Sequence, residues 1–141
     1  MTMPADSYST SLRIEAPPEV VFECFCDPRA MLTWMGERAE LDPRPGGLFL
    51  LDVGPFRVRG RYVVVERPSR LVFSWGFDET PDFPEGSSTV EVSLTPEGTA
   101  TQLTLVHSGL PAAEAPKHGQ GWTKYLPRLA AAARYAQGIP R

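Results

Sequence analysis

The hydrophobic pattern of this chain changes period twice, and this change limits the folds open to it. After one alternating stretch near the start, apolar residues recur at helical spacing up to about residue 36. They alternate from about residue 46 to 107 and return to helical spacing from residue 121. Period two is typical of half-buried strands, and recurrence every three to four residues is typical of amphipathic helices. The pattern therefore predicts an α+β fold: one strand, two short helices, about six antiparallel strands and a long helix.

The first 36 residues are expected to form the strand and the two short helices. Residues 8–14 alternate, and Pro17 and Pro18 then end the strand. Pro18 suits the first turn of a helix that continues through "PEVVFECF". Asp27 can cap a second short helix, which Gly36 would end.

The middle of the chain is expected to be a sheet of antiparallel neighbours, because the links between its alternating segments are short. Gly54 and Pro55 are a hairpin signal between two such segments. Arg57, Arg59 and Arg61 share the outward face of one segment, which predicts a solvated face that discourages edge pairing, with an anion or partner contact as the alternative. The segments predicted as strands are 48–53, 56–66, 70–77, 89–95 and 101–107.

An alanine-rich helix is predicted over residues 121–138, with Gly138 suited to its end. Pro127 removes one backbone donor and is expected to kink it. His118 is expected in the loop before this helix, and Gly119 and Gly121 in the turn that enters it. One apolar stripe is formed by Trp122, Tyr125, Leu126, Leu129 and Ala133.

Composition narrows the class of protein further. A chain of 141 residues suits one domain, residues 1–141, and its net charge of −3 gives no general attraction to nucleic acid or to an anionic membrane. The start of the chain lacks the basic and apolar regions of a secretory signal. Cys24 and Cys26 are expected to be reduced thiols, which favours a cytoplasmic location. The cysteines and histidines lack zinc-site spacing and no nucleotide-binding glycine motif occurs, so no metal and no cofactor is predicted.

Three short motifs occur in order along the chain: "GGLF" at 46–49, "RLVFSW" at 70–75 and "HGQGWTKYLPRL" at 118–129. With the order of elements, they resemble the START-like superfamily, also called SRPBCC, and within it the branch related to the activator of the heat-shock-protein-90 ATPase. The resemblance implies a helix-grip fold, in which a curved antiparallel sheet wraps around the C-terminal helix and encloses a hydrophobic ligand cavity. Its members include lipid carriers, hormone receptors, polyketide cyclases and chaperone activators, so it does not fix one function.

The expected partner is a small hydrophobic or aromatic molecule in a cavity between the sheet and the C-terminal helix. His107 or Tyr62 would orient it through a hydrogen bond, although core packing is the alternative for each lining residue. Two other functions stay open. One is a cyclase- or hydratase-like enzyme in which His107 and Tyr62 or Tyr125 move protons, and the other is a chaperone-associated interaction module. The sequence does not decide whether the chain is an enzyme, or whether it is a monomer or a homodimer. The residues expected to bound the cavity are Trp34, Phe56, Tyr62, Trp75, His107, Trp122 and Leu126.

Overall fold

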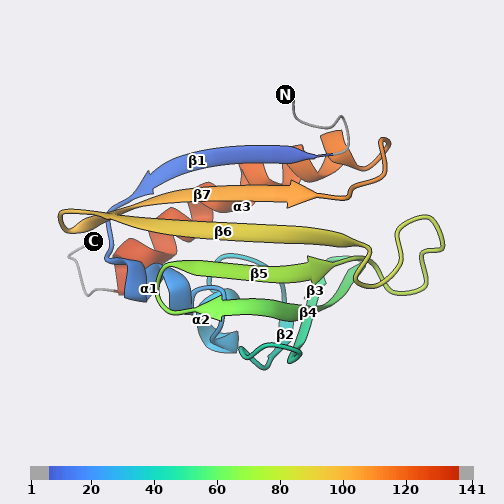
Figure 1. Ribbon diagram of the computed structural model, residues 1–141, viewed down its shortest axis with the longest axis horizontal. Helices are drawn as coiled ribbons and strands as arrows, with labels where there is room; N and C mark the ends of the chain where they lie inside the picture. The colour runs from blue at the N-terminus through green and yellow to red at the C-terminus, as the bar shows by residue number, and fades with distance from the viewer. Residues whose placement is uncertain (1–6, 137–141) are drawn as a thin grey trace.

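The computed structural model describes residues 7–136 and contains one antiparallel sheet with the strand order β1-β7-β6-β5-β4-β3-β2 (Figure 1). Every strand pairs antiparallel with its neighbours, and the first strand, β1, pairs with the last strand, β7, at one edge of the sheet. In chain order the elements are β1 (Tyr8–Ile14), α1 (Pro18–Glu23), α2 (Pro28–Met31), β2 (Arg38–Leu41), β3 (Leu48–Val53), β4 (Phe56–Glu66), β5 (Arg70–Trp75), β6 (Ser88–Glu97), β7 (Ala100–Ser108) and α3 (Ala115–Ala136).

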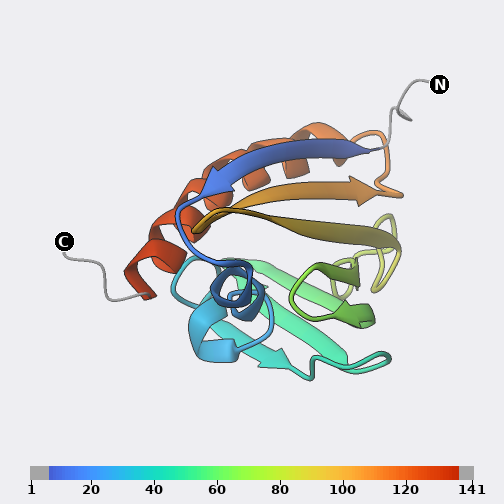
Figure 2. The same cartoon turned by 60° about the vertical axis from the view of Figure 1, so that its left-hand side comes forward.

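The long helix α3 covers one face of the curved sheet. It runs behind β1, β7 and β6 in Figure 1 and ends beside α1, and the turned view shows the sheet curving around it (Figure 2). The predicted α+β helix-grip fold is therefore confirmed, as are the two short helices after the first strand. Among the described residues, none of the helices combines the length and the hydropathy of a membrane span.

Local chemistry explains the start of the chain. Pro17 is extended and Pro18 opens α1, while the Asp27 carboxylate accepts a hydrogen bond from the Arg29 backbone N–H at 3.1 Å and caps α2. The strand β2 was not predicted, because residues 38–41 are not among the segments that alternate clearly. It pairs with β3 and extends the sheet at the edge opposite β1.

The alternating apolar residues of β6 and β7 form the inward faces of these strands. Val90 and Val92 of β6, and Leu103, Leu105 and His107 of β7, are 0–1% exposed. The neighbouring strands add aromatic rings to the same core, and Phe49 stacks on Phe73 with ring centroids 4.3 Å apart. Alternation thus indicated correctly which side chains point toward α3.

The arginines of β4 are all engaged by this protein's own groups. Arg57 pairs with Asp78, and the Arg59 guanidinium donates to the Asp52 carboxylate at 3.0 Å. Arg61 donates to the Gly46 carbonyl at 2.8 Å. The alternative of an anion or partner contact on this stripe has no support from these side chains.

The helix α3 begins at Ala115, earlier than predicted, so placing His118, Gly119 and Gly121 before it was wrong. All three lie inside the helix. Pro116 stands in the first turn, where a missing N–H costs nothing. Gly119 is needed for close packing, since a Cβ there would lie 2.9 Å from the Tyr8 ring. The helix continues through Pro127, and its predicted end at Gly138 lies outside the described residues.

The two cysteines are free and buried, which confirms that they are not bridged. Burial raises the pKa of the Cys24 thiol to about 11 and that of Cys26 to about 12. Both are therefore neutral, unreactive thiols packed beside α1 and not a redox pair.

Candidate functional site

A pocket of about 590 Å³ opens between α3 and the β3–β4 hairpin. Its walls come from the hairpin, from the end of β5 and the segment after it, and from the first half of α3. This volume is within the range typical of small-molecule sites. Most of the lining residues are apolar or aromatic, and the set comprises Met35, Glu37, Val53, Gly54, Pro55, Phe56, Val58, Trp75, Phe77, Thr80, Glu114, Lys117, His118, Gly121, Trp122, Lys124 and Tyr125.

One wall of the pocket is a column of stacked rings. Phe56 stacks on Phe77 with centroids 5.0 Å apart, and Phe77 stacks on the His118 imidazole at 5.6 Å. Phe83 supports the column from behind, with its edge toward both Phe77 and His118. Phe56 is 52% exposed at the outer end, so a large aromatic surface stands at the pocket mouth.

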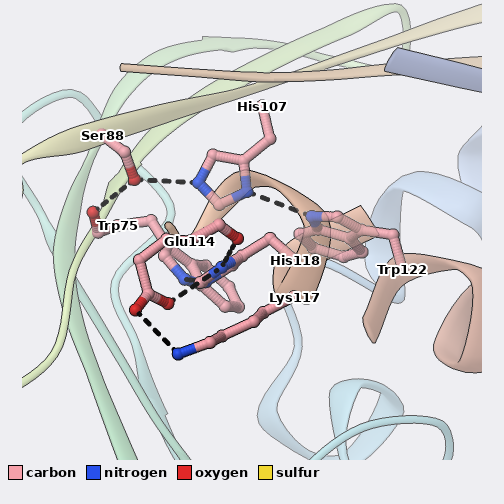
Figure 3. Close-up of polar contacts among 7 residues, drawn as sticks. All are labelled: Trp75, Ser88, His107, Glu114, Lys117, His118 and Trp122. Atoms are coloured by element: carbon pink, nitrogen blue, oxygen red, sulfur yellow. Dashed lines mark hydrogen bonds and ion pairs between the residues drawn. The ribbon is translucent and has the colours of Figure 1, made fainter. Parts of the chain in front are cut away.

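Two tryptophans form the inner end of the pocket. The indoles of Trp75 and Trp122 lie with centroids 5.4 Å apart, and each directs its N–H toward a histidine (Figure 3). Trp122 donates to Nδ1 of His107 at 3.1 Å, and Trp75 donates to Nε2 of His118 at 3.2 Å. Each indole N–H therefore has a partner inside the protein.

The partners of His107 fix its tautomer. Because Nδ1 accepts from Trp122, the neutral ring carries its proton on Nε2 and donates to the Ser88 hydroxyl at 2.8 Å. Ser88 in turn donates to the Trp75 carbonyl at 2.6 Å. The result is a directed chain of hydrogen bonds from the Trp122 indole to the backbone of β5 (Figure 3).

His118 has the opposite tautomer. Its Nε2 accepts from Trp75, so Nδ1 carries the proton and donates to the Glu114 carbonyl at 3.1 Å. The Glu114 carboxylate lies 3.6 Å from the same nitrogen and 3.6 Å from the Lys117 ammonium (Figure 3). Glu114 is thus balanced by Lys117.

Both histidines are held neutral. Burial, with a smaller contribution from His118, lowers the pKa of His107 to about 3, and burial also lowers the pKa of His118, against the raising influence of Glu114. A general base needs a free lone pair, and both acceptor nitrogens already hold an indole N–H. Neither ring is placed for proton transfer to a molecule in the pocket.

The residues expected around the cavity divide into two groups. Phe56, Trp75 and Trp122 line the pocket. His107 lies behind Trp122, with no exposed surface. Tyr62, Trp34 and Leu126 are buried in the core away from the lining.

The buried polar aromatics of the core bind backbone groups. The Tyr62 hydroxyl donates to the Phe25 carbonyl at 2.7 Å, and the Trp34 indole donates to the Cys24 carbonyl at 2.9 Å. Burial also raises the pKa of Tyr62 far above its ordinary value. The Tyr62 hydroxyl and the His107 ring therefore both have protein partners in place of the ligand bond expected for one of them.

Sequence reasoning expected Trp122 in the lining but missed Lys117 and His118, which lie before residue 121, where α3 was expected to begin. His118, Trp122 and Tyr125 are spaced four and three residues apart, which is helical spacing, and Pro116 marks a helix start. Together, these features would have predicted that His118 and the nearby lysines line the pocket. Within residues 7–136 no group of three or more histidine, cysteine, aspartate or glutamate side chains is placed to hold a metal ion.

A curved antiparallel sheet around a long C-terminal helix, with a pocket between them, defines a START-like protein. Residues 15–134 match the family described as activator of Hsp90 ATPase homolog 1-like protein. The chain belongs to that family, and the predicted resemblance is confirmed.

Several solved structures are similar to this chain. CalU16 from Micromonospora echinospora is 29% identical with a TM-score of 0.73, over 96% of this chain and 76% of that one. An Hsp90 activator from Plasmodium falciparum is 26% identical with a TM-score of 0.72, over 95% and 97% of the two chains. DynU16, from the dynemicin biosynthetic locus, is 28% identical with a TM-score of 0.78, over 97% of this chain and 49% of its own. No curated protein matched the chain.

Proposed function

We propose that this protein binds a flat aromatic or other apolar small molecule in the pocket between α3 and the β3–β4 hairpin. The single observation that carries the proposal is the pocket of about 590 Å³ walled by Trp75, Trp122 and the Phe56–Phe77 stack. Aromatic walls of this kind favour a flat ligand, which can stack against several rings at once. The similarity to DynU16, a protein of a biosynthetic locus, is consistent with a small-molecule role.

The expected affinity is modest for a small ligand. A bicyclic aromatic such as 2-naphthamide that buries about 200 Å² of apolar surface gains roughly 5 kcal/mol, before the cost of association. A gain of roughly 5 kcal/mol corresponds to a dissociation constant of roughly 200 µM, and the cost of association weakens it further, so we expect binding in the millimolar range for this neutral compound. An NMR titration that follows the indole N–H resonances of Trp75 and Trp122 measures both the affinity and the site.

A substitution at Gly121 tests the location. Gly121 lines the pocket, and a Cβ there would meet no heavy atom within 4 Å, so Gly121→Phe places a ring in the empty space without disturbing the core. Gln120→Phe is the matched control, because Gln120 is exposed and is not part of the lining. We expect Gly121→Phe to abolish binding and Gln120→Phe to retain it.

Two results would contradict the proposal. If no flat apolar compound shifts the tryptophan resonances, the rings are only core packing. If Gly121→Phe binds as well as the control, the ligand occupies another place. Leu126 would be a less suitable position for this test, since that side chain is 3% exposed and packed in the core.

A second candidate function is association with an Hsp90-type chaperone. It is supported by the family match and by the similarity to the Hsp90 activator from Plasmodium falciparum, which aligns over nearly the whole of both chains. The test is the ATPase rate of a purified Hsp90 with and without this protein. An unchanged rate, with no complex in analytical ultracentrifugation, would reject this role.

An enzyme of the cyclase or hydratase kind has less support from the site. The proton-moving groups expected for it were His107 with Tyr62 or Tyr125. The first two are buried and bonded within the protein, and only Tyr125 lines the pocket.

A further inference from the structure

Most polar groups of the pocket lining already form hydrogen bonds within the protein. The indole N–H groups of Trp75 and Trp122 are both used by imidazoles, and both nitrogens of His118 are occupied. Thr80 donates to the Asp78 carbonyl at 3.2 Å. These groups therefore offer a ligand little beyond their ring surfaces.

The two carboxylates of the lining are also engaged. Glu37 accepts from the Gly54 backbone N–H through both oxygens, at 3.0 and 3.2 Å, and so fastens the β3–β4 hairpin. Glu114 pairs with Lys117 and lies beside His118. Glu114 thus has a cationic partner, whereas Glu37 is held at the hairpin by a backbone N–H and keeps its charge.

What remains is a positive group of the lining, the Lys124 ammonium. Lys124 and Tyr125 both line it, and the Lys124 ammonium lies 5.2 Å from the centre of the Tyr125 ring. Arg128, one turn further along α3, lies 5.3 Å from the same ring. Within the described part of the chain, no ion pair links Lys124 or Arg128 to a carboxylate.

We propose that the pocket selects aromatic molecules that carry an anionic group, a carboxylate or a phenolate, and that Lys124 and Tyr125 receive this group. The inference rests on the proposed function and names the ligand class of the same site. The aromatic part of the ligand would stack on the Phe56–Phe77 wall and the tryptophans. Its oxygen would accept charge-assisted hydrogen bonds from the Lys124 ammonium and from the Tyr125 hydroxyl.

The test compares 2-naphthoate with 2-naphthamide, which has nearly the same shape and no charge near neutral pH. Both are titrated into the wild type, Lys124→Gln and Arg134→Gln by NMR at low salt. Arg134 is the matched control, since it lies in the last turn of α3, is exposed and is outside the lining.

In the wild type we expect the naphthoate to bind about ten-fold more tightly than the amide, because a charge-assisted hydrogen bond is about twice as strong as a neutral one. Lys124→Gln should raise the dissociation constant of the naphthoate about five-fold and change that of the amide less than two-fold. Arg134→Gln should change neither by more than two-fold. Raising the salt concentration should weaken only the naphthoate.

The possible failures are distinguishable. If the two compounds bind the wild type equally, or if Lys124→Gln and Arg134→Gln weaken the naphthoate alike, the anionic preference is wrong and the aromatic pocket still stands. If neither compound binds the wild type, the proposed function fails, and the ligand class fails with it.

Discussion

Lowering the pH from about 7.5 to about 4.5 should remove roughly 2.5 kcal/mol of stability through His107 alone. This side chain is 0% exposed, and burial together with His118 lowers its pKa from 6.5 to about 3. The unfolded chain takes up a proton on this ring as the pH falls through 6.5, whereas the folded chain excludes it down to about pH 3. Each pH unit in that window lowers the free energy of unfolding by about 1.36 kcal/mol.

The contacts of His107 give the physical reason. A proton added to Nδ1 would point at the N–H of Trp122, which that nitrogen now accepts at 3.1 Å. The other ring nitrogen faces Ser88, and the nearest titratable ring is His118, with centroids 5.1 Å apart. The hydrogen-bonding partners of the ring are neutral groups, and no carboxylate among the described residues bonds to it to compensate the charge.

The assay is urea unfolding across this pH range for the wild type and His107→Gln. Glutamine can accept from Trp122 and donate to Ser88 but does not titrate, so the comparison cancels the carboxylates that both proteins share. The variant should be the less stable at pH 7.5, and the difference should shrink by roughly 2.5 kcal/mol at pH 4.5. A constant difference, or an NMR titration that gives His107 a pKa near 6.5, would refute the reasoning.

Three further predictions follow from the packing. Trp122→Ala should cost about 3–5 kcal/mol in denaturant unfolding, because the indole is 3% exposed, and a loss below about 1 kcal/mol would mean that it is not part of the core. Ser88→Ala should cost about 1–3 kcal/mol by the same measurement, because it leaves the Trp75 carbonyl and His107 Nε2 without this partner, and an unchanged stability would argue against the bond chain. Cys24 and Cys26 should react slowly with a thiol reagent in the folded protein and fully in denaturant, and fewer than two thiols in the unreduced, denatured chain would indicate a bridge.

The strands could be predicted because their alternation and their turns agree. The β3–β4 hairpin turns at Gly54, whose φ of +56° is a conformation that glycine adopts readily, and the facing strands alternate in phase. The edge strand β2 could not be predicted, because four residues with two apolar side chains are too few to show an alternating pattern.

The start of α3 was misplaced for a different reason. Two glycines at 119 and 121 lower the intrinsic helix propensity of this segment, so the glycines looked like a turn. Packing overrides that preference, because Gly119 lets the helix approach the Tyr8 ring of β1 closely. The position of His118 in the pocket follows from this contact between β1 and α3.

The candidate site was predicted in part because strand phase gives the direction of a side chain but not its depth. Tyr62, Trp75 and His107 all point inward as expected, yet only Trp75 reaches the pocket. The Tyr62 hydroxyl donates a hydrogen bond to the Phe25 carbonyl, and the His107 ring donates one to the Ser88 hydroxyl. Which inward residues meet a ligand depends on where helices and loops fill the space above the sheet.

The paired histidines explain how a pocket with two tryptophans can suit an apolar ligand. An indole N–H that faced an apolar molecule without a partner would cost about 1–3 kcal/mol. His107 and His118 accept hydrogen bonds from both of these N–H groups. Each imidazole donates its own N–H to an oxygen, the Ser88 hydroxyl for His107 and the Glu114 carbonyl for His118. The tryptophans can therefore present ring surface to the ligand, while Lys124 adds a positive charge to the lining. An aromatic wall combined with an ammonium group in one lining is what a ligand with an aromatic body and an anionic group would need.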